Sequence, residues 1–267
     1  NAPAILEEPP EPERDDAERD YKVLILSAKT ENSLIRYIDD LKSFLLKEPS
    51  INLSDIAYTF QVGRKHFGYR KSITFQNKEE LIDLLDSDKL KNQVIKSKES
   101  HNSIVFMFPG QGSQYVNMGK SLYAKEPVFK EEMDKGFFLI KQLTGESYKE
   151  ILFPKTQLNT INETRYTQPI IFLLEYSLTR LMISLGVSPH YMIGHSIGEY
   201  VAACISGVFS FEDALRLVIK RGELMNSLEQ GSMLSIAIKE DEAKKFLTET
   251  ICLAAVNGPE QVVLSGD

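Results

Sequence analysis

YMIGHSIGEY, at residues Tyr191–Tyr200, is the stretch of sequence that decides the fold. A short apolar run here ends in Gly-x-Ser-x-Gly, and small residues follow it at 201–204. This layout is typical of a nucleophile elbow, in which a serine occupies a strained turn between a strand and a helix. The glycines allow the tight backbone, and the Ile197 N–H would lie at a helix N-terminus and donate to a developing oxyanion. Because the pattern is short, an ordinary turn serine is the alternative interpretation of Ser196.

A second apolar run, Ile104–Phe108, predicts a central strand covered on both faces. It leads into Pro-Gly-Gln-Gly-Ser-Gln at 109–114. Tyr115 stands where a dinucleotide-binding fingerprint needs its third glycine, and the sequence has no P-loop lysine here. We therefore expect a loop at the carboxyl end of a strand, where open α/β sheets bind ligands, with the Gln111 side chain offered to the site.

An arginine falls on the apolar face of a predicted helix. Ser210-Phe211-Glu212-Asp213 has the form of a capping box that opens this helix. Its apolar stripe consists of Phe211, Ala214, Leu215, Val218, Met225 and Leu228. Arg221 shares the stripe, and a guanidinium on a buried face is costly unless an anion pairs with it. Two interpretations are open here: a salt bridge within the core, or a fixed guanidinium that binds the carboxylate of an acidic substrate in a bidentate fork.

A serine nucleophile needs a base within hydrogen-bonding reach, and none of the four histidines is well placed. His195 adjoins the serine, so the two side chains diverge, and His195 is expected to shape the pocket. His190 lies at the other end of the strand, up to roughly 20 Å away at ~3.3 Å per residue. His101 precedes the first core strand, and His66 lies in an earlier unit. We infer that the base lies beyond residue 267, that the chain is a fragment, and that it is inactive in isolation.

Length and composition fit one large domain with a small one, since the chain has 267 residues and is 42% apolar. Residues 1–20 carry eight acids and two arginines, or −6 of the net charge of −7, so the remainder is near neutral and offers no basic face for nucleic acid. We see neither a membrane span nor a secretion signal. Cys204 and Cys252 form no metal or disulfide framework, and we expect both to be buried hydrophobes in a cytoplasmic protein.

Two smaller units flank this core in the sequence. Residues 21–90 alternate strand and helix patterns, with an apolar stripe over Leu34–Leu45, and predict an α+β unit without a chemical constellation of its own. Residues 232–264 predict a strand, a helix and two more strands, which need further chain to cover their sheet.

Three motifs, in this order, resemble one family. FPGQGSQ at Phe108–Gln114, GHSIGEY at Gly194–Tyr200 and RGELM at Arg221–Met225 are similar to the acyltransferase domain of modular type I polyketide synthases and to malonyl-CoA:acyl-carrier-protein transacylases. The resemblance implies an α/β fold for residues 101–267. It would comprise an α/β-hydrolase-like core over 101–230 and a truncated ferredoxin-like small subdomain over 231–267. Residues 21–100 resemble the ketosynthase-to-acyltransferase linker domain, and residues 1–20 the end of a ketosynthase with an acidic linker.

The same resemblance implies roles for single residues. The catalytic positions are Ser196, Gln111 and Ile197, and the substrate-binding positions are Arg221, His195 and Gln168. Ser196 would be acylated, the Ile197 N–H and Gln111 would stabilise the oxyanion, and Arg221 would hold the free carboxylate of a dicarboxylic acyl group. No metal or resident cofactor is implied. The substrate would be a coenzyme A thioester. The expected partners are an acyl carrier protein with its phosphopantetheine and an adjacent ketosynthase. Neither nucleic acid nor a membrane is expected as a partner.

Substrate choice follows from the same resemblance. Glu163–Gln168, with the sequence ETRYTQ, is similar to a stretch of malonyl-selecting members, and Ile197 stands where methylmalonyl-selecting members tend to carry glutamine. The expected function is therefore transfer of a malonyl group in polyketide biosynthesis. A serine hydrolase such as a thioesterase, which needs neither a buried arginine nor the Gln111 loop, is one alternative. A non-catalytic scaffold fragment is the other.

Overall fold

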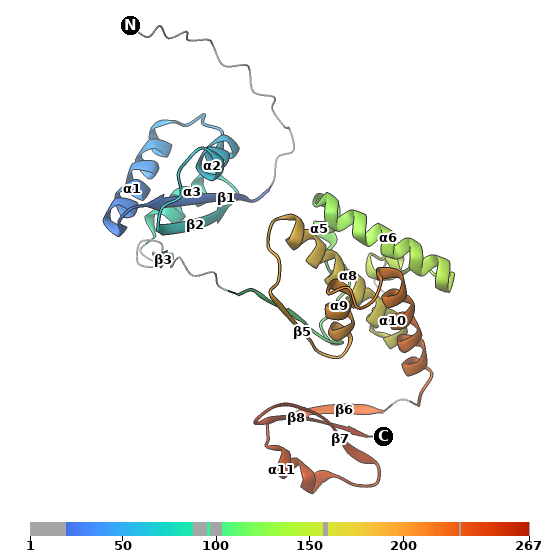
Figure 1. Ribbon diagram of the computed structural model, residues 1–267. Coiled ribbons are helices and arrows are strands. Elements are labelled where there is room, and N and C mark those ends of the chain that lie inside the picture. The colour runs from blue at the N-terminus through green and yellow to red at the C-terminus, as the bar shows by residue number, and fades with distance from the viewer. Residues whose placement is uncertain (1–19, 88–94, 97–102, 157–159, 230, 267) are drawn as a thin grey trace, which may run out of the picture. The chain divides into compact units, whose positions relative to one another are not determined.

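The computed structural model describes residues 20–87, 95–96, 103–156, 160–229 and 231–266. The chain divides into two compact units, Asn1–His101 and Asn102–Asp267 (Figure 1). Each unit has a hydrophobic core of its own. The expected end of a ketosynthase in residues 1–20 lies almost wholly outside the described residues. None of the helices in the described ranges combines the length and apolar character needed to cross a bilayer.

The described residues of the first unit form an antiparallel sheet of order β1-β2-β3 together with three helices. Its elements are β1 (Lys22–Ala28), α1 (Glu31–Lys47), α2 (Leu53–Val62), β2 (Tyr69–Phe75), α3 (Lys78–Asp86) and β3 (Ile95–Lys96). Thr30, Asn52 and Asn77 cap the three helices by accepting hydrogen bonds from first-turn N–H groups. The predicted stripe of α1 is confirmed, because Leu34, Ile38, Leu41 and Leu45 are all buried.

The second unit begins with β4 (Val105–Phe108), which pairs in parallel with β5 (Tyr191–Gly194). The elements between these strands are α5 (Lys120–Lys125), α6 (Pro127–Thr144), α7 (Tyr148–Leu152), η1 (Thr160–Asn162) and α8 (Thr164–Ser184). α9 (Ile197–Ile205) and α10 (Phe211–Asn226) follow β5. The register sets Phe108 opposite Gly194, so the loop after β4 and the elbow after β5 emerge at the same sheet edge.

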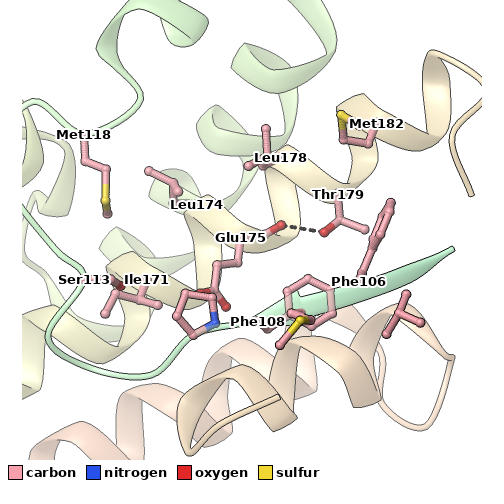
Figure 2. A pocket seen from close by; sticks show the side chains of 13 residues that line it. Phe106, Phe108, Ser113, Met118, Ile171, Leu174, Glu175, Leu178, Thr179 and Met182 are labelled. Carbon is pink, nitrogen blue, oxygen red and sulfur yellow. Dashed lines mark hydrogen bonds between the residues drawn. The ribbon is translucent and has the colours of Figure 1, made fainter. Parts of the chain in front are cut away.

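β4 is not covered on both faces within the described chain. Met107 is 76% exposed and Val105 51%, whereas Phe108 is buried. The expectation of a strand covered on both faces is wrong for these residues, because Phe106 and Phe108 pack in the core (Figure 2) while Val105 and Met107 point to the opposite face and are exposed. The fold is mixed α/β, and the α/β-hydrolase-like core stays a prediction.

α10 buries a narrower face than its sequence predicts. The buried residues are Ala214, Leu215, Val218, Ile219 and Gly222. Met225 and Leu228, which we expected on the buried stripe, are exposed, and Leu228 falls after the end of the helix. The predicted N-terminal cap is confirmed, since the Ser210 hydroxyl accepts a hydrogen bond from Asp213 N at 3.1 Å.

The C-terminal residues form an antiparallel sheet of order β6-β8-β7. Its elements are β6 (Ser232–Ile236), α11 (Glu240–Ala243), η2 (Lys244–Phe246), β7 (Ile251–Gly258) and β8 (Gln261–Gly266). The predicted order of strand, helix, strand and strand is confirmed, while the ferredoxin-like assignment stays a prediction. Cys204 is buried as expected, but Cys252 in β7 is exposed, so that expectation is wrong. Successive side chains of a strand point to opposite faces, and Cys252 lies on the solvent-exposed face of β7.

Candidate active site

Ser196 sits at a sharp turn between β5 and α9. Its φ of 54° and ψ of −113° are unusual for a residue with a side chain. Steric crowding explains why both positions that flank this turn are glycines. A Cβ at Gly194 would lie 2.2 Å from Glu199 N, and one at Gly198 would lie 2.2 Å from Phe108 O. The strand, turn and helix expected of a nucleophile elbow are therefore present, and they leave Ser196 exposed.

Ile197 begins the helix that follows the elbow. Its side chain is fully buried in the core, so the residue faces the site through its backbone. The N–H groups of the first helical turn lack acceptors within the helix and carry partial positive charge. This is the arrangement needed to stabilise negative charge beside Ser196 Oγ.

The loop after β4 lies against the elbow. His195 N donates to Phe108 O at 2.9 Å. A Cβ at Gly110 would come within 2.7 Å of His195 Nδ1 and 3.5 Å of Ser196 Cβ, so the loop passes close because Gly110 has no side chain. Gln111 follows at once, and its Nε2 donates to Thr164 Oγ1 at 3.1 Å. The structure thus brings Gln111 to the first turn of α8, beside the elbow loop.

Arg221 reaches the serine from α10. Its Nη2 donates to Ser196 Oγ at 3.2 Å, and its Nη1 donates to Gln168 Oε1 at 2.5 Å. The guanidinium carbon lies 5.7 Å from the centre of the Tyr200 ring. Arg221 is half-buried rather than buried, so one side of the guanidinium is held by the protein while the other stays accessible. No carboxylate of the described chain pairs with it, which disfavours the alternative of a salt bridge within the core.

Gln168 lies behind Arg221 and is 1% exposed. Its Oε1 accepts from Arg221, and its Nε2 donates to Met225 Sδ at 3.1 Å. The contact depends on a close approach of α8 and α10, since a Cβ at Gly222 would lie 3.2 Å from Arg165 Cα. Both polar ends of the amide are therefore occupied by α10, which suits a residue that orients Arg221.

Comparison with known proteins decides the family. Residues 105–267 match the model described as "Acyl transferase domain", and residues 22–85 match "CurL-like, PKS C-terminal". The chain belongs to the acyltransferase domains of polyketide synthases. It is 34% identical over 253 residues to Mycoketide-CoA synthase of Mycobacterium tuberculosis and 32% identical over 282 residues to Erythronolide synthase EryA3 of Saccharopolyspora erythraea. These alignments cover 91% and 100% of this chain but 6% and 9% of those proteins.

Solved acyltransferase domains share the fold. The domain of ZmaA is 41% identical with a TM-score of 0.86, and the alignment covers 93% of this chain and 60% of that chain. The domain of SpnD, solved in complex with 2-(pent-4-yn-1-yl)malonyl, is 29% identical with a TM-score of 0.82, over 93% of this chain and 59% of that chain. The present chain thus spans about three fifths of these solved domains.

The ETRYTQ stretch of the acyltransferase meets the site at two positions. Thr164 holds Gln111, and Gln168 holds Arg221. Tyr166 is instead 5% exposed, and its hydroxyl donates to Glu146 Oε2 at 2.5 Å. Burial and this carboxylate raise the pKa of Tyr166 to about 12, so the phenol stays neutral. The stretch therefore acts on the site through Thr164 and Gln168, while its aromatic residue supports the helix.

The described histidines of the acyltransferase make hydrogen bonds with groups other than the serine hydroxyl. His190 accepts a hydrogen bond from Ile104 N through Nδ1, at the start of the two parallel strands. His195 is exposed, and its backbone joins the β4 loop. No histidine of the described residues is bonded to Ser196, whose Oγ accepts from Arg221. The predicted base beyond residue 267 stays a prediction.

Sequence reasoning missed three residues that build the site. Glu199 Oε1 accepts from Gly194 N at 3.1 Å and braces the elbow. Tyr200 faces the Arg221 guanidinium, and Thr164 anchors Gln111. Glu199 and Tyr200 belong to GHSIGEY and Thr164 to ETRYTQ, so the motifs themselves were the available signal.

Proposed function

We propose that this acyltransferase transfers a malonyl group from malonyl-CoA, through an ester on Ser196, to the phosphopantetheine thiol of an acyl carrier protein. The observation that carries the proposal is the 3.2 Å contact between Arg221 Nη2 and Ser196 Oγ. A malonyl group on that oxygen has its free carboxylate one methylene away from the ester carbonyl. A guanidinium beside the oxygen is placed to bind this carboxylate in a bidentate fork. The malonyl derivative bound to the SpnD domain supports the same substrate class.

The proposed reaction has two half-reactions. Ser196 Oγ attacks the thioester carbonyl of malonyl-CoA, its proton passes to a base, and the C–S bond breaks as coenzyme A takes up the proton and leaves as the thiol. The carrier thiol then attacks the seryl ester, and Ser196 Oγ regains a proton as it leaves. The Ile197 N–H and Gln111 would donate to the oxyanion in both steps. We assign the base to a histidine outside this chain.

The finer assignments belong to the same proposal. We place Arg221, Gln168 and His195 around the acyl group, with Gln168 acting through Arg221 and His195 shaping the entrance. We propose an α/β-hydrolase-like core and a ferredoxin-like small subdomain, for which the match to solved acyltransferase domains is the support. A ketosynthase neighbour is supported by the match of residues 22–85 to "CurL-like, PKS C-terminal".

Binding tests the proposal without needing turnover. Calorimetry would compare malonyl-CoA with acetyl-CoA, which lacks the free carboxylate. We expect the wild-type chain to prefer malonyl-CoA and Arg221→Ala to lose that preference. Arg216→Ala is the matched control, because Arg216 lies on the same helix but pairs with Glu212 at 2.6 Å. An unchanged preference in Arg221→Ala would refute the role of the guanidinium.

A second measurement separates transfer from hydrolysis. In a longer polypeptide that supplies the base, the acyltransferase is expected to load a carrier protein with the malonyl group. Release of free malonate at the same rate with and without the carrier would favour the serine hydrolase. Ser196→Ala should abolish loading, and persistence of loading would favour the scaffold interpretation.

A further inference from the structure

Basic side chains gather at one end of the sheet in the first unit. The strand pairing creates this end, because Ala28 lies opposite Tyr69 and Tyr69 lies opposite Lys96. The loop between α2 and β2 reaches the same place. We call this surface the basic patch, and its members are Lys29, Arg64, Lys65, Arg70 and Lys96. All five side chains are exposed.

Two aromatic rings hold the cations of the basic patch close to one another. Lys29 Nζ lies 5.8 Å and Lys65 Nζ 5.9 Å from the centre of the Phe67 ring. Lys96 Nζ lies 5.8 Å from the centre of the Tyr69 ring. A cation over a ring at an exposed site gains only about 0.5–1 kcal/mol. These contacts therefore place the positive charges without neutralising them.

Hydrogen bonds fix the loop that carries Arg64 and Lys65. Ser27 Oγ donates to Lys65 O at 3.2 Å and accepts from Phe67 N at 3.0 Å, so the loop is tied to β1. Arg70 Nε donates to Phe67 O at 2.8 Å and ties the loop to β2. The basic patch is thus formed in advance, and a partner that binds it needs to order little of this loop.

The basic patch lacks carboxylate partners within the described residues. None of its five members forms an ion pair there. Residues 20–87 hold ten acids and ten bases, but the sequence has no acid between Asp55 and Glu79. The patch therefore reflects segregation of charge rather than an excess of bases. Five like charges held together raise the local positive potential and favour an anionic partner.

We propose that the basic patch binds the acidic segment at residues 7–16 of this same chain. The segment, EEPPEPERDD, lies outside the described residues. It carries six acids and one arginine, a net charge of −5, against five positive charges in the patch. Exposed ion pairs contribute only about 0.2–1 kcal/mol each, so binding requires several of these carboxylates at once. An acidic partner protein would then reach the patch only by displacing the segment.

Chain length allows this contact. Lys22 and Ala28, the two ends of β1, are six residues apart, which is roughly 20 Å at ~3.3 Å per residue. Residues 7–16 precede Lys22 by six to fifteen positions, so extended chain carries them roughly 20 to 50 Å. Covalent linkage also gives the segment an effective concentration in the millimolar range, which favours it over a second copy of the chain. This inference does not depend on the proposed transfer reaction.

Carbodiimide crosslinking of the full chain tests the proposal. The reagent condenses a carboxylate with a lysine amine into an amide only where the two groups touch, and mass spectrometry identifies the pair. We expect residues 7–16 to crosslink to Lys29, Lys65 and Lys96 at least about tenfold more than to Lys47. Lys47 is an exposed lysine of the same unit. It ends α1, a helix about 25 Å long that begins two residues after Lys29.

Salt and one charge reversal supply independent readouts. Raising the ionic strength from about 0.1 M to about 1 M shortens the screening length from ~10 Å to ~3 Å, so the crosslinks to the basic patch should fall at least about fivefold. Arg64→Glu keeps every lysine and should lower them at least about threefold. Arg36→Glu reverses an exposed charge of the same unit outside the patch and should leave them unchanged.

Three outcomes overturn the proposal. The first is an equal yield at Lys47 and at the basic patch, and the second is a yield that responds neither to salt nor to Arg64→Glu. The third comes from mixing isotopically heavy and light chains, since crosslinks mainly between the two would make a second copy the occupant. If Arg64→Glu lowers the melting temperature, Lys29→Glu replaces it and is judged by the yields at Lys65 and Lys96.

Discussion

Replacing Gln168 by glutamate should switch off recognition of the free carboxylate without touching Ser196. The amide oxygen of Gln168 accepts a hydrogen bond from Arg221 Nη1 at 2.5 Å, and the side chain is 1% exposed. Gln168→Glu keeps the shape of the side chain and sets a permanent carboxylate against the guanidinium. The substrate carboxylate would then compete with an internal one that is already in place.

The magnitude follows from the geometry. Two unit charges about 4 Å apart attract each other by ~4 kcal/mol at an effective dielectric constant of 20. Arg221 is half-buried, so solvent reduces this value, and a hydrogen bond to a charged group contributes about 1.5–3 kcal/mol net. We expect malonyl-CoA to bind about ten- to hundredfold more weakly to Gln168→Glu, since each 1.4 kcal/mol is tenfold. Acetyl-CoA, which makes no use of the guanidinium, should bind as before.

The assay is calorimetric titration of both thioesters against wild type, Gln168→Glu and the neutral variant Gln168→Met. Gln168→Met removes the acceptor without adding charge, so its loss of malonyl-CoA affinity should be smaller. Equal weakening of malonyl-CoA and acetyl-CoA would show that the variant disturbs the coenzyme A region. An unchanged preference for malonyl-CoA in Gln168→Glu would refute the reasoning that Gln168 acts on the substrate through Arg221.

Three further predictions concern folding. Gly198→Ala places a Cβ 2.2 Å from Phe108 O, so calorimetry should show loss of the cooperative unfolding of the second unit, whereas Gly68→Ala, which meets nothing within 4 Å, should leave it intact. The pKa of Glu175 is about 8 in the folded chain, above its usual 4.5, so the folded chain holds an extra proton between these values. Stability should therefore fall as pH rises from 4.5 to 8, by on the order of a few kcal/mol, and urea titrations of Glu175→Gln should show a flatter profile. Asn52→Ala removes the cap of α2 and should cost the first unit about 1 kcal/mol in urea unfolding, and an unchanged midpoint would contradict the capping role.

Local sterics explain which features the sequence could predict. The elbow was predictable because Gly194 and Gly198 each avoid a clash that any side chain would create. The positions of the two glycines in the sequence therefore indicate the turn. The stripe of α1 was predictable because four apolar residues at helical spacing face one core. A functional role for Arg221 near Ser196 was suggested because a cation falls on the apolar face of a predicted helix. The family resemblance then implied that this cation binds the free carboxylate of the acyl group.

Contacts between distant segments explain what the sequence could not predict. Gln168 and Arg221 are 53 residues apart, and their pairing depends on the packing of α8 against α10 at Gly222. The exposure of Met107 and Cys252 depends on which strands and helices cover them, which a pattern of apolar residues does not specify.

The backbone of Ser196 has an evolutionary consequence. A residue with a side chain held at φ 54° and ψ −113° costs about 1–3 kcal/mol, and glycine at the same position would relieve most of that strain. Selection for thermal robustness alone would thus drive the position toward glycine. A descendant freed from the proposed transfer chemistry should therefore lose the hydroxyl early, and retention of a serine here would report that chemistry more directly than any residue of the core.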